Sequence, residues 1–375
     1  MKILLFLLTA ACVDAQMLSE IVAGMAPPGG TGGGSCTPTS GFLHCRPLTI
    51  NSSQVGGATL SNFAVLTGNA SGPLTLGAPR IQNSNCYDVV FTSDSAGALM
   101  IPWEMESCAP STGAVIAWVQ LASVSASANT TFYVSYDNPS ISAAQNIGAN
   151  APSNVWDSNY VLVQHLPNGT TLTSSDSTSI ANNCTNHNAT ATTGRIDGAA
   201  ALNGSSAYLE CGNVTGLASM TFSVWINSTF TSSASRALTE GYYGGDDSNT
   251  GMIMQMQTNG NVMFGLGYHP FSTTVSSGTS IADGNWHYVV GEVTSGAASL
   301  YIDAGTPVAA GASSLTLTSS NNFEISGYNN GSGDMFSGSL DEVRASKIAR
   351  PANWITAEYN NQWAGSTFLT VGGEI

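Results

Sequence analysis

Short segments in which apolar and polar residues alternate recur along most of the chain, and this pattern most constrains its fold. A period of two is typical of strands that bury one face, and clusters of Gly, Asn, Ser and Pro separate the segments. The segments lie at 87–92, 115–121, 131–136, 160–165, 207–209, 221–227, 251–257, 262–267, 286–293, 298–302, 314–318, 322–326 and 336–344. Strand after strand predicts an all-β protein made of β-sandwiches.

One segment near the end reads as a helix. Pro351 suits a first helical turn, and Ile355 and Tyr359 share a face because they are four residues apart. We expect one short C-terminal helix over 351–362, which closes the second of two sandwiches.

The negative net charge of the chain excludes polyanionic partners. Charged residues make up 8% of the 375 residues, and 8 Lys and Arg oppose 23 Asp and Glu. The net charge of −15 leaves too little positive charge to neutralise nucleic acid or to dock on an anionic membrane. Disorder is excluded because 42% of the residues are hydrophobic.

The first residues have the order of a secretory signal peptide: Lys2, an apolar stretch at 3–11, and small residues before Gln16. We expect residues 1–15 to be removed and the protein to be secreted, to the extracellular space or the cell surface. A lipoprotein with a lipidated Cys12 is the alternative. The apolar run is about half of the roughly 20 residues that a membrane span needs, and no later segment is expected to insert.

Six cysteines remain after removal of the signal peptide, and an even number in an exported chain indicates disulfides. Although 15 connectivities are possible in principle, the cysteines fall in sequence as three neighbouring pairs. We expect these local pairs to form: Cys36 with Cys45, Cys86 with Cys108, and Cys184 with Cys211. No CxxC spacing occurs and there are only 5 His, so we expect no zinc site.

Composition divides the rest of the chain. Residues 16–43 are rich in Gly and Pro and read as a linker or arm. A stretch of Ser, Ala and Asn between Asn138 and Pro152 separates two series of strands. We therefore expect a small β-sandwich of unknown function at 44–150 and a second sandwich at 151–375.

The second series resembles a laminin G-like module of the concanavalin A-like lectin/glucanase superfamily, in the form common in bacterial, archaeal and phage surface proteins. The stretches that carry the resemblance are 194–200, 202–204, 207–209, 220–226, 284–289, 299–303, 336–344 (Phe-Ser-Gly-Ser-Leu-Asp-Glu-Val-Arg), 349–350 and 354–362. The first series resembles the small uncharacterised β domain that often precedes this module, through 46–50, 88–92, 101–107 and 133–139. The resemblance implies that the second sandwich is a concanavalin A-like jelly roll of two curved sheets.

The resemblance leaves activity open, because relatives include carbohydrate binders, adhesion modules and spacers. Catalytic glucanases of this superfamily carry Glu-x-Asp-x-x-Glu on one strand, and this sequence has no such spacing. His-Glu-x-x-His and Gly-x-Ser-x-Gly are also absent. We interpret His165 and His287 as structural residues and expect no enzyme.

Two loops are candidates for ligand binding. Asp246 and Asp247 stand among Tyr and Asn, a mixture that suits sugar recognition because rings stack on aromatic side chains while carboxylates and amides bind hydroxyls. A second aromatic rim follows at Tyr268 and His269. The candidate ligand residues are Tyr242, Tyr243, Asp246, Asp247, Asn249, Tyr268 and His269.

Asp341 is the candidate metal ligand. The resemblance implies a structural calcium bound by an Asp of the last long strand together with backbone oxygens. Because Asp341 alternates with the apolar Leu340, we expect it to point away from the core. The alternative is a salt bridge with Arg344 or another Arg. We expect no other cofactor.

These observations favour a secreted, non-catalytic, lectin-like protein that binds a glycan, an extracellular matrix component or another surface polymer, with other surface proteins as further partners. The alternative is a structural or display component of a cell surface, filament or virion. In that case the sandwiches are spacers.

Overall fold

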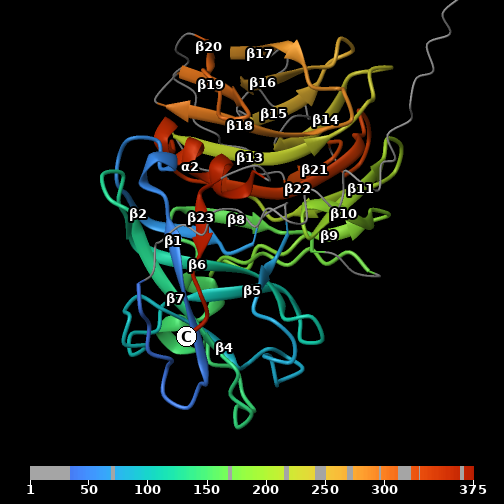
Figure 1. Cartoon of the computed structure of the whole chain (residues 1–375). Coiled ribbons are helices and arrows are strands. Elements are labelled where there is room, and N and C mark those ends of the chain that lie inside the picture. The colour runs from blue at the N-terminus through green and yellow to red at the C-terminus, as the bar shows by residue number, and fades with distance from the viewer. Residues whose placement is uncertain are drawn as a thin grey trace, which may run out of the picture.

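The computed structural model describes residues 34–68, 72–167, 171–214, 219–240, 251–267, 273–294, 297–310, 322–328, 330–363 and 367–375. These residues form two stacked β-sandwiches with a helix between them (Figure 1). The all-β class and the two sandwiches are as expected. The signal peptide and most of the arm lie outside the described residues, as does the expected strand at 314–318.

The first sandwich contains two four-stranded antiparallel sheets within the described residues. One has the order β23 (Leu369–Val371), β1 (His44–Ile50), β7 (Thr130–Tyr136) and β4 (Val89–Thr92). In the other, β6 (Ala114–Val124) pairs with β2 (Leu60–Leu66) and β3 (Leu74–Thr75) on one edge and with β5 (Trp103–Ala109) on the other. Short 3-10 turns lie outside the sheets: η1 (Ser52–Gln54), η2 (Gly148–Asn150) and η3 (Pro152–Asn154).

The second sandwich contains, among the described residues, an eight-stranded and a seven-stranded sheet, both antiparallel. The eight-stranded sheet has the order β10 (Thr190–Ile196), β11 (Gly198–Asn203), β22 (Ser337–Ser346), β13 (Met220–Asn227), β18 (Trp286–Thr294), β19 (Ala297–Ile302) and β20 (Val308–Ala310), with β8 (Tyr160–Gln164) also paired to β22. The seven-stranded sheet has the order β17 (Thr273–Ser280), β16 (Asn261–Gly267), β15 (Gly251–Met256), β14 (Ser235–Glu240), β21 (Phe323–Ile325), β12 (Tyr208–Cys211) and β9 (Thr185–His187).

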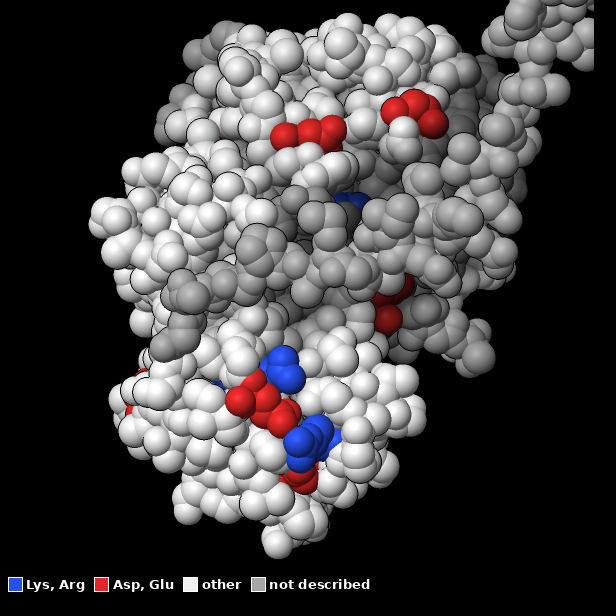
Figure 2. All heavy atoms as spheres, viewed as in Figure 1, with Lys and Arg blue, Asp and Glu red and all other residues white. Residues whose placement is uncertain are grey.

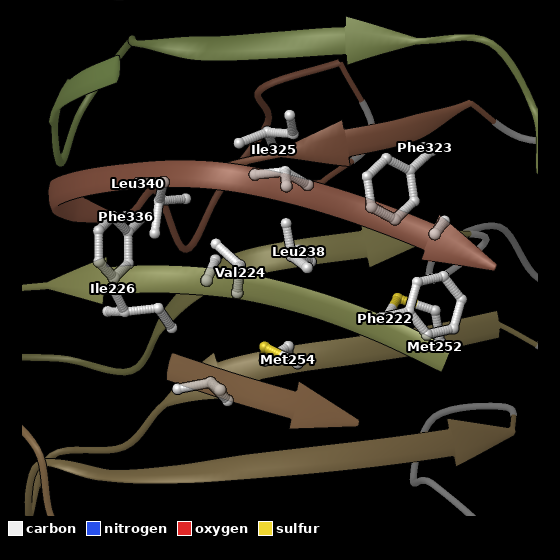
Figure 3. Packing of buried hydrophobic residues seen from close by; sticks show 14 of the residues in the cluster. Phe222, Val224, Ile226, Leu238, Met252, Met254, Phe323, Ile325, Phe336 and Leu340 are labelled. Atoms are coloured by element: carbon white, nitrogen blue, oxygen red, sulfur yellow. The ribbon is translucent and has the colours of Figure 1, made fainter. Parts of the chain in front are cut away.

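The main core of the second sandwich lies between its two sheets, as alternation predicts. Phe222, Val224 and Ile226 of β13 face the other sheet, where Leu238 and Met254 meet them (Figure 3). Each of these side chains is at most 1% exposed. Burying one large apolar side chain contributes about 1.5–3 kcal/mol, so this layer fixes how the two sheets stack.

The end of the chain returns to the first sandwich, whereas the expected second sandwich ran to residue 375. Strand β23 pairs with β1, with Leu48 opposite Val371. Ile375 and Cys45 then exchange backbone hydrogen bonds of 3.0 Å in both directions. Composition could not predict this return, because a three-residue strand carries too little alternation to be recognised.

The predicted helix is α2 (Ala352–Gln362), preceded by Pro351. Ile355 and Tyr359 pack on Trp225 and its neighbours on the outer face of the eight-stranded sheet. The helix also contacts β2 and η1 of the first sandwich. It therefore joins the two sandwiches, whereas the sequence predicted only that it closes the second.

The three expected cysteine pairs are present as disulfides: Cys36–Cys45, Cys86–Cys108 and Cys184–Cys211. The first of them, together with the buried Phe42, ties the last residues of the arm to the first sandwich. Cys184 and Cys211 belong to the core of the second sandwich.

Candidate functional site

The ligand residues predicted from the sequence lie outside the described residues: Tyr242, Tyr243, Asp246, Asp247 and Asn249 in 241–250, and Tyr268 and His269 in 268–272. The strands that flank these segments are described. Glu240 and Gly251 end and begin neighbouring strands, as do Gly267 and Thr273. Because Gly251 pairs with Gly267, both segments connect at the same end of the seven-stranded sheet.

The outer face of this sheet carries a row of residues in register across six strands. Most of their neighbours along each strand belong to the core, so the row faces away from it, with Thr239 and Ile253 only 2% and 0% exposed. The row consists of Glu210, Glu324, Thr239, Ile253, Gly265 and Thr274. We call it the outer row. It places two carboxylates side by side on β12 and β21.

Aromatic rings flank the carboxylate end of the outer row. His187 stacks on Tyr208 with ring centroids 4.2 Å apart and planes 4° apart. The His187 Nε2 atom lies 3.4 Å from an oxygen of Glu210. Tyr208 is only partly buried. A partly exposed ring beside a carboxylate is a group that can stack on a sugar and bind its hydroxyls.

Glu324 is the more buried of the two carboxylates, 4% exposed. Burial raises its pKa, while the backbone N–H groups of Asn330 and Gly331, which donate to it, counteract this shift. On a neighbouring part of the face, the Arg236 guanidinium lies 3.8 Å from the centre of the Tyr328 ring and donates to Asp334 at 2.7 Å.

A pocket of about 300 Å³ lies where β13 ends and β22 begins. Hydroxyl and amide groups line it, together with one aromatic ring: Asn227, Ser228, Thr229, Phe230, Thr231, Ser232, Ser337, Gly338 and Ser339. No charged residue lines it among the described residues. Runs of Ser and Thr in the sequence indicate turns more often than a binding pocket, so the sequence indicated this pocket only weakly.

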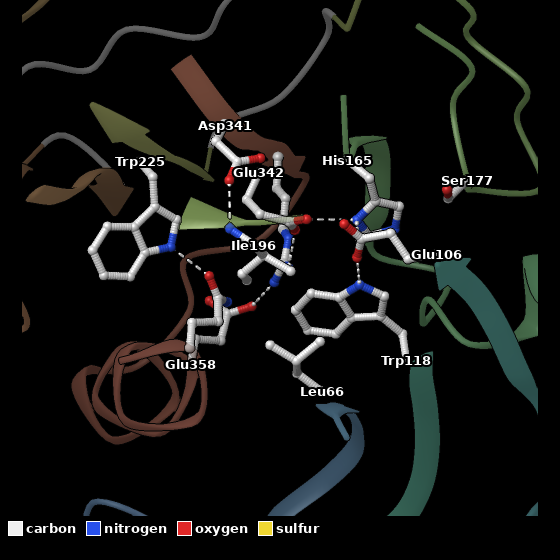
Figure 4. A network of polar contacts seen from close by, with 12 residues as sticks. Leu66, Glu106, Trp118, His165, Ser177, Ile196, Trp225, Asp341, Glu342 and Glu358 are labelled. Carbon is white, nitrogen blue, oxygen red and sulfur yellow. Dashed lines mark hydrogen bonds and ion pairs between the residues drawn. The ribbon is translucent and has the colours of Figure 1, made fainter. Parts of the chain in front are cut away.

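Asp341 is fully buried, which differs from the expected surface ligand (Figure 4). Leu340 does lie in the core between the sheets, so Asp341 points away from that core as expected. The face it points to is covered, however. Its Oδ2 atom accepts the backbone N–H groups of Arg195 at 2.8 Å and Ile196 at 2.9 Å. Of the alternative Arg partners, Arg344 binds Glu342 and Glu358. Arg195 interacts electrostatically with Asp341.

The surroundings of Asp341 fit calcium poorly. Calcium needs six to eight oxygen ligands, whereas N–H groups point at the Asp341 carboxylate. Its Oδ1 atom is buried without a hydrogen-bond partner. Burial and the nearby Glu342 raise the pKa of this carboxyl well above its usual value, so a proton can take the place of a cation. Calcium at Asp341 stays a prediction.

A buried polar cluster at the junction of the sandwiches was not predicted. Glu104 and Glu106 of β5 share one side of their strand and meet His165, which follows β8. Glu342 of β22 reaches the same imidazole. The signal in the sequence was the pair of acidic residues two positions apart at the end of an apolar stretch. Interpreting it required knowing which strand of the other sandwich lies opposite.

Residues 197–356 match the family model described as the concanavalin A-like lectin/glucanases superfamily. The second sandwich is a concanavalin A-like domain. The comparison with the curated proteins gives no match. Solved structures that match part of the chain include domain 4 of AbnA, an extracellular arabinanase from Geobacillus stearothermophilus, in complex with arabinotriose. This match is 20% identical, has a TM-score of 0.38, and covers 45% of this chain and 79% of that one.

Two further matches to part of the chain are more distant in sequence. The CBM40 of the Ruminococcus gnavus IT-sialidase, bound to α2,6 sialyllactose, is 13% identical with a TM-score of 0.34 over 38% of this chain and 84% of that one. The botulinum neurotoxin serotype D binding domain is 14% identical with a TM-score of 0.41 over 54% and 50%. At these values no ligand can be transferred to this chain from a neighbour.

Proposed function

We propose that the chain is a secreted, non-catalytic, lectin-like protein whose concanavalin A-like domain binds a glycan or another surface polymer. The observation that carries this proposal is the seven-stranded sheet. Its outer face places the stacked His187 and Tyr208 beside Glu210, and both predicted ligand loops connect at one end of the same sheet.

The surface supports a neutral ligand. On the face in Figure 2 most described atoms belong to uncharged residues, and on the lower sandwich acidic and basic groups lie side by side. Such a surface attracts no polyanion over long range, so recognition depends on hydroxyl, amide and aromatic contacts.

Three disulfides support an oxidising, extracytoplasmic compartment. Among the described residues, no helix combines the length and the apolar character needed to cross a membrane. Secretion itself is tested by the N-terminus of the exported protein, which we expect at Gln16.

The binding experiment is a glycan array followed by polysaccharide pull-down with the full chain. We expect a neutral or weakly charged glycan to be retained. Tyr208→Ala should weaken its binding at least about 10-fold, the loss of one stacking contact of about 1.4 kcal/mol. The double variant Tyr242→Ala with Asp247→Ala tests the loops. Tyr87→Ala, a partly buried aromatic residue of the first sandwich, is the matched control.

Two results would contradict the proposal. If no glycan binds and the protein assembles as its concentration rises, measured by light scattering, the function as a structural or display component is supported instead. If the retained glycan is cleaved, seen as new reducing ends, the protein is an enzyme. Retained binding in both the Tyr208 and the loop variants would move the site elsewhere, with the hydroxyl-lined pocket tested next.

A further inference from the structure

Three side chains from different parts of the chain converge at the junction of the sandwiches: Glu106 of β5, His165 after β8, and Glu342 of β22 (Figure 4). The His165 Nδ1 atom lies 2.8 Å from Glu342 Oε1 and 3.7 Å from Glu106 Oε2. The side chains are only 1%, 6% and 0% exposed, in the order named. We call them the junction triad.

The junction triad has the donors and spacing of a metal site. One imidazole nitrogen and one oxygen from each carboxylate lie within 4.8 Å of one another. Ligand atoms around a tetrahedral zinc ion at about 2.0–2.2 Å lie roughly 3.3–3.6 Å apart. Donors at most 4.8 Å apart would have to approach by up to about 1.5 Å, shared between two side chains, to reach bonding distance. A nitrogen ligand with two carboxylates suits a divalent transition metal and does not suit calcium.

A second shell of contacts already orients the three ligands. The indole N–H of Trp118 donates to Glu106 at 2.7 Å, and Arg344 donates to Glu342 at 2.5 Å. The Nε2 atom of His165 faces Glu104 at 3.4 Å. This contact is not a hydrogen bond, and Nδ1 is paired with Glu342 at 2.8 Å. With a proton on Nε2 beside Glu104, the lone pair of Nδ1 would be available to a metal, which is the usual arrangement of metal-binding histidines.

The site also has an unmet need for positive charge. The carboxyl groups of Glu104, Glu106 and Glu342 lie within 3.7 Å of His165, and Arg344 contacts Glu342. The Oε1 atom of Glu106 is buried without a hydrogen-bond partner.

We propose that Glu106, His165 and Glu342 bind one divalent transition metal ion of the zinc class, which fastens the first sandwich to the second. Glu106 belongs to the first sandwich and the other two ligands to the second, so the bound ion links them directly. This inference is independent of the glycan-binding proposal. It also differs from calcium at Asp341 in ligands and in metal.

The experiment uses the full chain with its disulfides intact, unfolded in denaturant with a chelator and refolded with or without equimolar ZnCl₂. We expect one zinc per chain by elemental analysis and a higher melting temperature in the zinc-loaded sample. Loading with CoCl₂ instead should give visible absorption bands of cobalt bound by nitrogen and oxygen. CaCl₂ alone serves as a comparison.

Two variants and one control locate the ion. His165→Gln and Glu106→Gln should each weaken zinc binding at least about 100-fold. His287→Gln removes a histidine of the second sandwich that lies 2.8 Å from Asp303 and should leave zinc binding unchanged. Near-UV circular dichroism shows whether each variant folds, and Glu106→Gln keeps the test valid if His165→Gln does not.

The proposal is overturned if the wild-type chain refolds without retaining zinc or cobalt, or if both junction variants retain them like the wild type. It is also overturned if CaCl₂ raises the melting temperature and ZnCl₂ does not. That outcome would return attention to Asp341.

Discussion

At the scale of single residues, one irregularity in β22 decides which side chains face the junction. Asp341 pairs with Trp225 and Arg344 with Ser223, so two residues of β22 face one residue of β13. Glu342 takes the positive φ of 51° that this bulge requires. As a result Val343 returns to the core between the sheets, while Asp341, Glu342 and Arg344 all lie on the junction side.

The core leaves no room for a side chain at Gly291. It lies on β18 opposite Phe222, and a Cβ atom there would be 2.6 Å from the ring of Phe264 on the other sheet. Gly291→Ala should lower the free energy of unfolding by about 1–3 kcal/mol because the ring or the strand must move. Chemical denaturation measures this. Gly373→Ala, where a Cβ would meet nothing within 4 Å, should have no such effect.

Glu240 should make the stability of the protein depend on pH. Burial raises its pKa to about 8, although the N–H of Val214 donates to it. The folded state therefore holds a proton that the unfolded state releases near pH 4.5, and stability falls as pH rises from about 4.5 to about 8. Glu240→Gln should remove this loss and raise the free energy of unfolding at pH 7 by roughly 3 kcal/mol. Equal pH slopes in wild type and variant, from denaturation at pH 5 and pH 8, would contradict this.

At the scale of elements, α2 connects the sandwiches through its polar side chains. Asn361 accepts the N–H of Leu66 at 2.7 Å and donates to the carbonyl of the same residue at 3.0 Å, so it completes the edge of β2. Glu358 accepts hydrogen bonds from Tyr160, Tyr288 and Arg344. The apolar face of α2 alone would predict a helix that only covers the second sandwich.

Asn361→Asp tests this link. The carboxylate keeps the acceptor but loses the donor, and it adds a charge at a position only 3% exposed. The free energy of unfolding should fall by about 1–3 kcal/mol at pH 7. The defect should shrink at low pH, where the protonated acid can donate again. Asn353→Asp is the control. Asn353 is only partly buried and donates a longer bond of 3.3 Å to Ala58, so this variant should lose much less stability.

At the scale of the whole molecule, two of the few basic residues are buried at the junction of the sandwiches. Of 8 Lys and Arg, Arg344 and Arg350 are 2% and 3% exposed. Arg350 binds both carboxylate oxygens of Asp157 at 2.8 Å, and Arg344 lies over the rings of Trp118 and Trp156. Removing one partner of such a pair leaves a buried charge without compensation. Separating the sandwiches would therefore cost much free energy.

We therefore expect the two sandwiches to unfold in one transition. Scanning calorimetry should give a calorimetric enthalpy equal to the van't Hoff enthalpy. Deleting residues 368–375 removes the buried Phe368 and β23, and should destabilise the protein by at least about 3 kcal/mol. Val371→Thr, at an exposed position of the same strand, is the control. Two separate transitions in the wild type would show that the junction does not couple the sandwiches.

The sequence by itself determined the all-β class and many of the strands, though not β10, β11, β14 or β17. It also determined the helix, predicted at 351–362 and observed at 352–362, the three local disulfides, and the resemblance that residues 197–356 bear out. These features depend on residues close together in the chain, where a period of two or a short separation is visible directly. Only the tertiary structure placed β23 beside β1 and brought Glu106, His165 and Glu342 together. Such contacts join residues far apart in sequence, and no local pattern encodes which faces of the two sandwiches meet.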